Sequence, residues 1–254
     1  MSRRKIVAGN WKMNLEAQAA GQLADDIIAN AEKEKVSDDV ELILIPPFPY
    51  LDFVGSKLKG VNIRYGAQDC SAHEEGAFTG EVSATMICSI GAKFILVGHS
   101  ERRKYFNESA ELLIEKMNKV LATIGTPIFC CGESIEDRKS NNHFSVVESQ
   151  ISDVVLELKK SDAEKIIIAY EPVWAIGTGE TASPEQAQEM HAFIRDLIEK
   201  KFGKVLAKNL PILYGGSVNE KNAADLFKQD DVDGGLVGGA SLKAASFIAI
   251  AKSF

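Results

Sequence analysis

Long apolar runs and concentrated positive charge are both missing from this sequence of 254 residues. No apolar stretch approaches the roughly 18 residues that a membrane-spanning helix needs, so we expect no membrane contact. Lysine and arginine number 29 against 36 aspartates and glutamates, a formal net charge of -7. Because nucleic acids bind concentrated basic faces, we expect no nucleic-acid partner. The apolar run after Arg3 and Arg4 stops at Asn10, too early for an export signal, which favours a cytoplasmic protein.

Cysteine is scarce, and its spacing matches neither a disulfide framework nor a metal site. The four cysteines are Cys70, Cys88, Cys130 and Cys131. The last two are adjacent, so on a strand they would point to opposite faces instead of bonding to each other. We therefore expect reduced thiols. No pair of His, Cys or carboxylate residues is spaced as in HExxH or CxxC, and we expect no metal.

Motifs for nucleotide cofactors are missing or misplaced. The chain has no Walker loop, in which a glycine-rich turn ends in Lys and Ser or Thr. Gly177 to Ala182 matches the pattern G-x-G-x-x-A, but a dinucleotide fingerprint begins directly at a strand end. Here the six residues from Glu171 to Ile176 come between the strand end and the pattern. We expect no cofactor.

One structural unit recurs along the chain: a short β-branched run, a turn with Gly, Pro or Asn, and an amphipathic helical stretch. Strands that alternate with helices indicate right-handed crossovers and a parallel sheet. Eight units without a linker, in a length near the roughly 250 residues of a (β/α)8 barrel, favour a closed barrel over an open doubly wound sheet. We predict an α/β fold with a single (β/α)8 barrel domain over residues 1–254. The eight runs are Lys5 to Asn10, Val40 to Ile45, Val61 to Ala67, Lys93 to Val97, Pro127 to Cys131, Lys165 to Tyr170, Pro211 to Tyr214 and Val232 to Val237.

A carboxylate stands directly at the end of the sixth run. Ile166 to Tyr170 is typical of a parallel strand that is buried on both faces, because it lacks polar alternation. Glu171 then leaves the sheet at its carboxyl edge, held by Pro172 and followed by Gly177 and Gly179, which can absorb a hinge motion. The pattern predicts a proton-transferring base beneath a closing lid. The competing interpretation is a solvated loop residue, which would be favoured for a lone glutamate.

Glycine turns follow the seventh and eighth runs. Gly215 to Ser217 and the pair Gly238 and Gly239 each stand between a strand and a helical stretch, where N–H groups and a helix dipole point at one place. Because barrels commonly bind phosphate after strands seven and eight, the two turns together predict a phosphate site. Either turn alone could be a plain turn. Lys12 offers a cation for a phosphate dianion, although a surface lysine would fit the same pattern.

His99 follows the fourth run and precedes Ser100 to Arg103, a candidate helix start. A helix dipole disfavours the protonated form of histidine at that end, so we expect a neutral imidazole that donates a hydrogen bond. His73, His143 and His191 are expected to be loop or helix-surface residues without a partner.

Several of these segments together closely resemble the triosephosphate isomerase family. The resemblance spans all eight units in order, and Cys131 departs from it at a strand end where an apolar residue is expected. It implies a (β/α)8 TIM barrel that interconverts dihydroxyacetone phosphate and D-glyceraldehyde 3-phosphate by general-base proton transfer through an enediolate, in glycolysis and gluconeogenesis. The segments are Gly9 to Asn14, Val97 to Arg103, Ala169 to Gly179, Tyr214 to Ser217 and Val237 to Leu242.

The resemblance also implies a catalytic role for each matching residue. Glu171 removes the carbon-bound proton and returns it to the neighbouring carbon, while His99 hydrogen-bonds the two substrate oxygens. Lys12 and Asn10 stabilise the oxyanion. Further candidates beside His99 are Ser100 and Glu101, and for Glu101 a buried salt bridge is the alternative.

Backbone donors of the glycine turns and of the lid grip the phosphate in this family. They match Gly177, Ser217, Gly238 and Gly239 here. Because Gly177 lies in the lid from Pro172 to Gly179, phosphate binding would itself close the lid and keep water from the enediolate.

The long segment from Asp69 to Gly80 resembles the intersubunit loop of the family, which implies a homodimer. Thr79 would then lie near Asn10 of the partner subunit, and Glu81 would pair with Arg102 of the partner subunit. From its spacing alone, a surface loop is the favoured interpretation of this segment.

Two other kinds of function stay open from the residues alone. Another phosphate-binding barrel enzyme, such as a sugar-phosphate epimerase or an aldolase, would share the anion site. A Schiff-base aldolase needs a lysine on a barrel strand, and Lys12 lies just past one. A non-catalytic phosphate-binding barrel would keep the glycine turns but would have no use for an aligned base.

Overall fold

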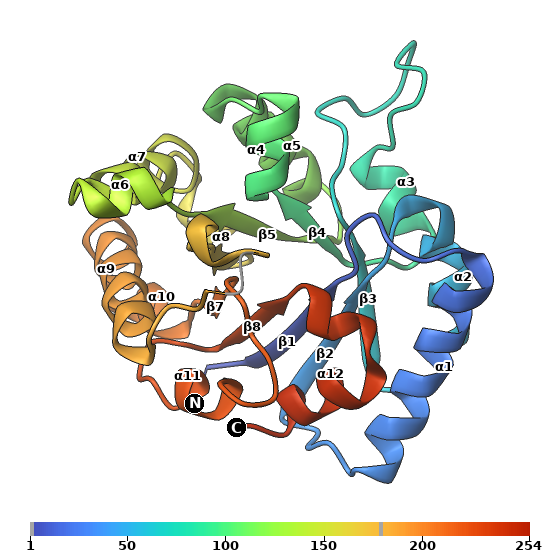
Figure 1. The fold of residues 1–254 in the computed structure, drawn as a ribbon. Helices are drawn as coiled ribbons and strands as arrows, with labels where there is room; N and C mark the ends of the chain where they lie inside the picture. The colour runs from blue at the N-terminus through green and yellow to red at the C-terminus, as the bar shows by residue number, and fades with distance from the viewer. Residues whose placement is uncertain (1–2, 178–179) are drawn as a thin grey trace.

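Eight parallel strands form one closed barrel, in chain order, in the computed structural model, which describes residues 3–177 and 180–254. Each strand pairs with the next along the chain, and β8 pairs with β1 to close the sheet. The helices surround the strands on the outside (Figure 1). The (β/α)8 fold is therefore confirmed. The strands are β1 Lys5–Asn10, β2 Val40–Ile45, β3 Ile63–Ala67, β4 Phe94–Val97, β5 Thr126–Cys131, β6 Ile167–Tyr170, β7 Ile212–Tyr214 and β8 Gly234–Val237.

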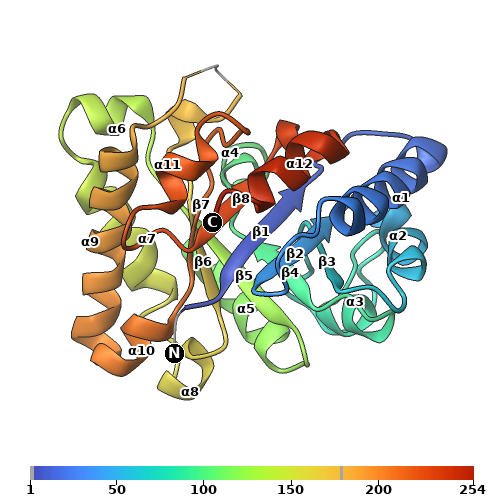
Figure 2. The ribbon, with the colours of Figure 1, turned by 90° about the horizontal axis from the view of Figure 1, so that it is seen from below.

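The connections between strands carry the helices, with α1 and α9 on opposite sides of the barrel (Figure 2). They are α1 Ala17–Lys33, α2 Leu51–Lys57, α3 Ala84–Ser89, α4 Ser100–Phe106, α5 Ala110–Leu121, α6 Ile135–Lys139, α7 His143–Val154, α8 Lys160–Ala163, α9 Pro184–Phe202, α10 Lys204–Asn209, α11 Ala223–Phe227 and α12 Ala244–Ala251, with short 3-10 turns η1 Phe48–Tyr50, η2 Val173–Ala175 and η3 Gly239–Leu242. That all of residues 1–254 form a single domain stays a prediction.

All eight predicted strands end at the residue expected from the sequence, whereas several begin elsewhere. β5 begins one residue early, and β3, β4, β6, β7 and β8 begin one or two residues late. Local turns explain the late starts. The amide of Lys165 donates to Asp162 at the end of α8, and the amide of Val61 donates to Leu58. Strand ends matter more for function, because they place the site.

Most strand residues are buried on both faces, as the largely apolar sequences indicate, although Arg64 of β3 and Lys5 of β1 are exposed. Cys130 belongs to the cluster inside the barrel, together with Ile6, Ile43 and Leu213. Cys131, its neighbour, belongs to the cluster between barrel and helices. The prediction that these thiols point to opposite faces is confirmed. All four cysteines are free, and burial raises the pKa of Cys130 well above its ordinary value.

Two of the three histidines expected on the surface are buried instead. His191 is 0% exposed, and its Nδ1 lies 3.1 Å from the carbonyl oxygen of Asp231. Burial lowers the pKa of His191 to about 3, so the ring is neutral. His143 is also buried, and its ring packs on Phe144 with 4.3 Å between centroids. The prediction was wrong because both residues lie on the core-facing side of amphipathic helices.

Arg195 joins α9 and the end of α10 to the start of β8, on the side of the barrel opposite the strand ends. Its guanidinium donates to the carboxylates of Asp231 (2.6 Å) and Asp233 (2.9 Å) and to the carbonyls of Ala207 (2.7 Å) and Leu210 (2.8 Å). Its side chain is only 11% exposed. The cluster is thus a nearly buried ion pair with its donors satisfied.

We expect Arg195→Met to lower the free energy of unfolding by about 3 kcal/mol, because it leaves the mostly buried carboxylate of Asp231 without a cation, whereas Asp233 keeps its pair with Arg3. Urea unfolding monitored by circular dichroism measures the change. Lys200→Met is the control: its pair with Asp196 is exposed to water, and we expect almost no change in the free energy of unfolding. Equal effects of the two substitutions would contradict this interpretation of the cluster.

Candidate active site

The loops at the strand ends surround one cavity of about 480 Å³. Ser100 and Glu101 contact two residues of its lining. The N–H of Ser100 donates to Glu171, and the carboxylate of Glu101 accepts from the ammonium group of Lys12. Eight predicted site residues line the cavity and come from the ends of β1, β4, β6, β7 and β8. They are Asn10, Lys12, His99, Glu171, Gly177, Ser217, Gly238 and Gly239.

Glu171 and His99 are in direct contact at the floor of this cavity. Oε1 of Glu171 lies 2.9 Å from Nε2 of His99, and the backbone N–H of Ser100 donates to Oε2 at 2.8 Å. Glu171 is 1% exposed. The competing interpretation of Glu171 as a solvated loop residue is therefore wrong: this carboxylate is buried and hydrogen-bonded.

Two glycines make room for Glu171. A Cβ atom on Gly132 would lie 1.7 Å from the carbonyl oxygen of Glu171, and one on Gly215 would lie 2.9 Å from its Cγ. The first clash is with backbone and cannot be relieved by a rotamer change. Gly215 belongs to a predicted anion turn, whereas Gly132 was not predicted, because its only signal is its place one residue after a strand end.

The protonation of the pair follows from its neighbours. The N–H of Glu101 points at Nδ1 of His99 (3.2 Å), which leaves the ring proton on Nε2, facing Glu171. Burial raises the pKa of Glu171, but the attraction of His99 and the hydrogen bonds from His99 and Ser100 outweigh it and hold that pKa below its ordinary value. Burial lowers the pKa of His99, yet the carboxylates of Glu171 and Glu101 raise it further.

The expectation for the pKa of His99 was thus wrong in direction, although His99 is the N-cap of α4 as predicted. The helix dipole alone would lower this pKa. Two carboxylates that face the ring reverse the sign, and they come from positions 2 and 72 residues away in the sequence, so helix geometry could not reveal them.

We expect His99→Gln to move the acid limb of the kcat/KM profile to higher pH. A base must be ionised, and His99 lowers the pKa of Glu171, so wild-type activity persists to more acidic pH. Without the imidazole, burial raises that pKa and activity is lost earlier as the pH falls. The substitution should also lower kcat roughly 10²-fold or more. His143→Gln changes a residue that does not line the cavity and should leave the profile unchanged. An unshifted acid limb in His99→Gln would contradict the coupling.

Lys12 reaches the cavity from a strained backbone. Its φ is 52°, the left-handed region, which costs a non-glycine residue roughly 1–2 kcal/mol. Its N–H donates to Oδ1 of Asn10 at 3.0 Å, and its ammonium pairs with Glu101. Because Oδ1 is engaged there, the amide NH2 of Asn10 is the donor group left for a ligand. The side chain of Glu101 is 43% exposed, so the buried salt bridge considered for it is instead an accessible one.

The glycine turns after β7 and β8 line the same cavity, and Gly238 lies beside Lys12. A Cβ on Gly239 would meet nothing within 4 Å, and η3 begins at that residue. After Ser217, by contrast, α11 begins only at Ala223. The helix expected directly after the turn from Gly215 to Ser217 is therefore absent. This turn offers an anion its backbone N–H groups, without a helix dipole close behind them.

The predicted lid from Pro172 to Gly179 is anchored at its first half, and its last two residues lie outside the described ranges. Ser217 donates to the carbonyl of Ala175 at 2.7 Å, which ties the lid to the seventh loop. Gly177 has φ of 70°, a conformation that favours glycine.

Glu133 is a functional candidate that the sequence analysis missed. It is 0% exposed, and its Oε1 accepts hydrogen bonds from Tyr170 and Trp174, both at 2.9 Å. The amide of Val173 donates to its carbonyl oxygen at 3.0 Å. One buried acid therefore holds the end of β6 and the start of the lid together. The sequence gives little sign of it beyond its place two residues after β5.

Comparisons with known proteins match nearly the whole chain. The family model described as triosephosphate isomerase matches residues 5–254. The triosephosphate isomerase of Flavobacterium johnsoniae is 50% identical over 248 residues, 98% of each chain. That of Bacteroides fragilis is 50% identical over 252 residues, 99% of each chain. The chain belongs to the triosephosphate isomerase family. The corresponding enzyme of Porphyromonas gingivalis is 47% identical over 99% of this chain and all of its own length.

The residues that the family resemblance assigns to a subunit contact lie away from the cavity. Thr79 and Glu81 are exposed in the segment between β3 and α3, which extends outward from the barrel (Figure 1). Nε of Arg102 is engaged within its own chain, 2.6 Å from Glu108 and 2.9 Å from Asp69. The segment from Asp69 to Gly80 has no helix or strand, as predicted.

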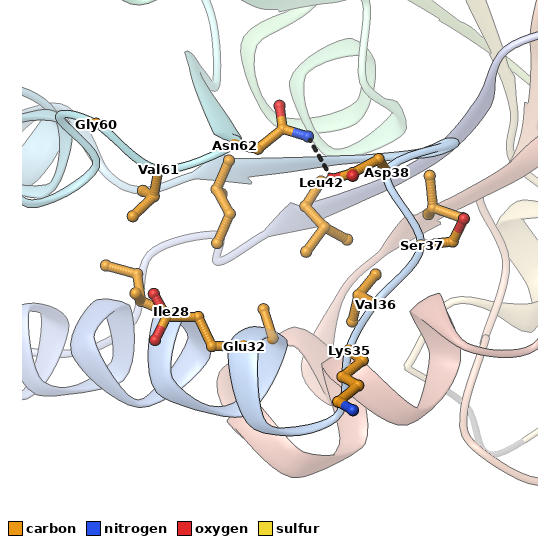
Figure 3. Close-up of a pocket in the computed structure, with 13 residues that line it drawn as sticks. Ile28, Glu32, Lys35, Val36, Ser37, Asp38, Leu42, Gly60, Val61 and Asn62 are labelled. Carbon is orange, nitrogen blue, oxygen red and sulfur yellow. Dashed lines mark hydrogen bonds between the residues drawn. The ribbon is translucent and has the colours of Figure 1, made fainter.

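A second cavity, of about 330 Å³, lies at the amino ends of β2 and β3 (Figure 3), and its lining shares no residue with that of the active-site cavity. Ile28, Val36 and Val61 are among its apolar side chains, and Asn62 donates to Asp38 across its rim at 3.4 Å. It lacks an aligned base and an anion turn. Within residues 3–177 and 180–254, no group of three or more His, Cys, Asp or Glu side chains could hold a metal ion, and no helix is long and apolar enough to cross a membrane.

Proposed function

We propose that this protein interconverts dihydroxyacetone phosphate and D-glyceraldehyde 3-phosphate by moving one proton between adjacent carbons through an enediolate. As a member of the triosephosphate isomerase family, it is an enzyme, an isomerase of triose phosphates. The observation that carries the mechanism is the contact of 2.9 Å between Glu171 and His99 at the floor of a cavity with a cation and glycine turns. The role would belong to glycolysis and gluconeogenesis in the cytoplasm.

Glu171 is the base in this proposal. Its pKa lies below the ordinary value, so the carboxylate is ionised at neutral pH and ready to accept a proton from carbon. Its burial takes it out of bulk water, which strengthens its electrostatic interactions with the reacting atoms. After the first transfer, the same carboxyl group returns the proton to the neighbouring carbon.

His99 and Lys12 stabilise the charge that develops on the substrate oxygens. The proton on Nε2 of His99 faces Glu171 in the free site and is available to a substrate oxygen once the carboxylate turns to the carbon-bound proton. Lys12 and the amide group of Asn10 line the same cavity and supply positive charge and a further donor. These donors are fixed before the reaction, which is what makes them effective.

The phosphate binds at Gly177, Ser217, Gly238 and Gly239 in this proposal. These residues line the cavity on the side away from β4, and Gly239 offers open space next to its Cα. A phosphate that bridges the lid residue Gly177 and the fixed turns would favour lid closure, because its binding energy is gained only in the closed arrangement.

We further propose that the enzyme is a homodimer whose contact involves the loop from Asp69 to Gly80. The loop is preorganised: the rings of His73 and Phe78 stack with centroids 3.6 Å apart. Phe78 and Met86 are 42% and 56% exposed and line the same small hollow, which leaves apolar surface for a partner to cover. Thr79 would approach Asn10 of the partner subunit, and Glu81 would approach Arg102 of the partner subunit. Light scattering should give twice the monomer mass of 27.6 kDa.

The activity is tested with purified protein in coupled assays of both directions, in the presence of a chelator and without added cofactor. We expect full turnover under these conditions. Family membership disfavours an epimerase or aldolase, and borohydride trapping with substrate adds an independent check, since stable labelling of Lys12 would indicate a Schiff-base aldolase. Binding of glycerol 3-phosphate without isomerisation would instead identify a non-catalytic binder and overturn the proposal.

A further inference from the structure

Gln68 follows β3 directly and stands behind Lys12, outside the described set of side chains that line the cavity. Its Nε2 donates to the carbonyl oxygen of Lys12 at 2.9 Å and to that of Ile45 at 3.1 Å. One side-chain amide therefore links the carboxyl ends of β1, β2 and β3. Both protons of its NH2 group are used in these two bonds.

These bonds act on the strained part of the site. Lys12 has a left-handed backbone, which a residue with a Cβ adopts only where its surroundings hold it. Asn10 holds the N–H of Lys12 and Gln68 holds its C=O, so the peptide groups on both sides of the strained Cα are fixed. Ile45 serves as the anchor, because its carbonyl oxygen also accepts the N–H of Trp11.

The conformation of Lys12 decides where its ammonium group lies. In the left-handed conformation, the ammonium group pairs with Glu101, and the side chain lines the cavity beside Gly238. A Cβ atom added to Gly238 would lie 3.6 Å from Cε of Lys12. Rotation of the backbone to an ordinary negative φ would change the direction of the Cα–Cβ bond and carry the ammonium away from this place. A displacement of about 1 Å at a charged group of the site can lower a rate roughly 10²-fold.

We propose that Gln68 is a positioning residue that locks Lys12 in its left-handed conformation and thereby aims the ammonium group at the substrate. The inference rests on the proposed function, in which Lys12 meets the phosphorylated substrate. Gln68 itself touches no substrate atom. Its chemical requirement is a donor of two hydrogen bonds, which a carboxylate of the same shape cannot supply.

Gln68→Met and Gln68→Glu test the requirement for the donor. Met keeps the length of the side chain and removes the donor, whereas Glu keeps the shape and turns both atoms into acceptors facing two carbonyls. We expect kcat/KM to fall roughly 10-fold to 100-fold in Gln68→Met and further in Gln68→Glu, with a matching fall in affinity for glycerol 3-phosphate. If either variant does not fold, the other carries the test.

Gln188→Met is the matched control. Gln188 also makes two hydrogen bonds with its side-chain amide, but at the opposite end of the barrel. Its Oε1 accepts from the N–H of Asp231 at 3.0 Å, and its Nε2 donates to the carboxylate of Asp231 at 2.6 Å. We expect it to lower the urea midpoint as Gln68→Met does, while kcat/KM stays within about twofold of wild type. A similar loss of kcat/KM in both variants would mean that Gln68 acts through stability alone and would overturn the inference.

A double-mutant cycle tests whether Gln68 acts through Lys12. In a Lys12→Met background there is no ammonium to aim, so adding Gln68→Met should change the affinity for glycerol 3-phosphate by less than about twofold. Losses that simply add would show an independent role for Gln68 and would overturn the inference. The wild-type assay separates this outcome from failure of the proposed function: an inactive wild-type enzyme refutes the function, whereas an active one with additive losses refutes only the role of Gln68.

Discussion

Glu171→Gln should lower kcat roughly 10³-fold while the affinity for glycerol 3-phosphate stays within about threefold of wild type. The amide can still accept the hydrogen bond that Ser100 donates at 2.8 Å, so the backbone and the anion turns keep their places. What is lost is the ability to accept a proton from carbon, an interaction used only in the transition state. A loss in kcat with little change in binding is the signature of such a group.

Steady-state kinetics and a ligand titration on the same preparation measure both parts of this prediction. Glu189→Gln serves as the control, because that side chain is 52% exposed and its contact with Arg138 is 3.4 Å long. We expect the control to retain wild-type kinetics. Turnover in Glu171→Gln that is comparable to wild type would refute the assignment of the base.

Lys12→Met should weaken binding as well as turnover, in contrast to Glu171→Gln. We expect the affinity for glycerol 3-phosphate to fall roughly 10-fold to 100-fold, the range of a charge-assisted hydrogen bond. The fall in kcat/KM should be larger, roughly 10³-fold or more, since the ammonium also stabilises the enediolate. Glu101 loses its partner, but it is accessible to water, so we expect little change in stability.

Lys221→Met is the matched control for charge. Lys221 is exposed in the segment that follows Asn219 of the cavity lining, so its removal changes the net charge near the same opening by the same amount. Isothermal titration at two salt concentrations compares the variants. If Lys221→Met weakened binding as much as Lys12→Met, the effect of Lys12 would be a general electrostatic one, and its proposed place against the substrate would be refuted.

The barrel follows from the sequence because its signal is repeated eight times. Parallel strands covered on both faces have largely apolar runs, and six of the eight runs end in Asn or directly before a Gly or Glu, whereas Pro46 and Gln68 follow the other two. That is why the strand ends were predicted to the residue while the starts were not. Starts depend on local turns, such as the one from Asp162 to Lys165, that have no strong pattern of their own.

The site could be predicted as residue types in loops, but not as a set of contacts. The identity of the carboxylate, the imidazole and the glycine turns follows from motifs. The sign of the pKa shift of His99 does not, because it depends on Glu171 and Glu101 facing one ring. Glu133 and Gln68 were missed for the same reason: each acts on a segment distant in sequence, and neither stands in a recognisable pattern.

The transfer of a proton by Glu171 is tested most directly by the fate of hydrogen in deuterium oxide. Wild-type enzyme is given dihydroxyacetone phosphate in deuterium oxide with a chelator and no cofactor, and the product is analysed by NMR. We expect D-glyceraldehyde 3-phosphate that carries solvent deuterium at C2, because a proton held on a carboxyl group exchanges with solvent before it returns. Product with its hydrogen wholly retained, as in a direct hydride shift, or no product at all, would contradict the account.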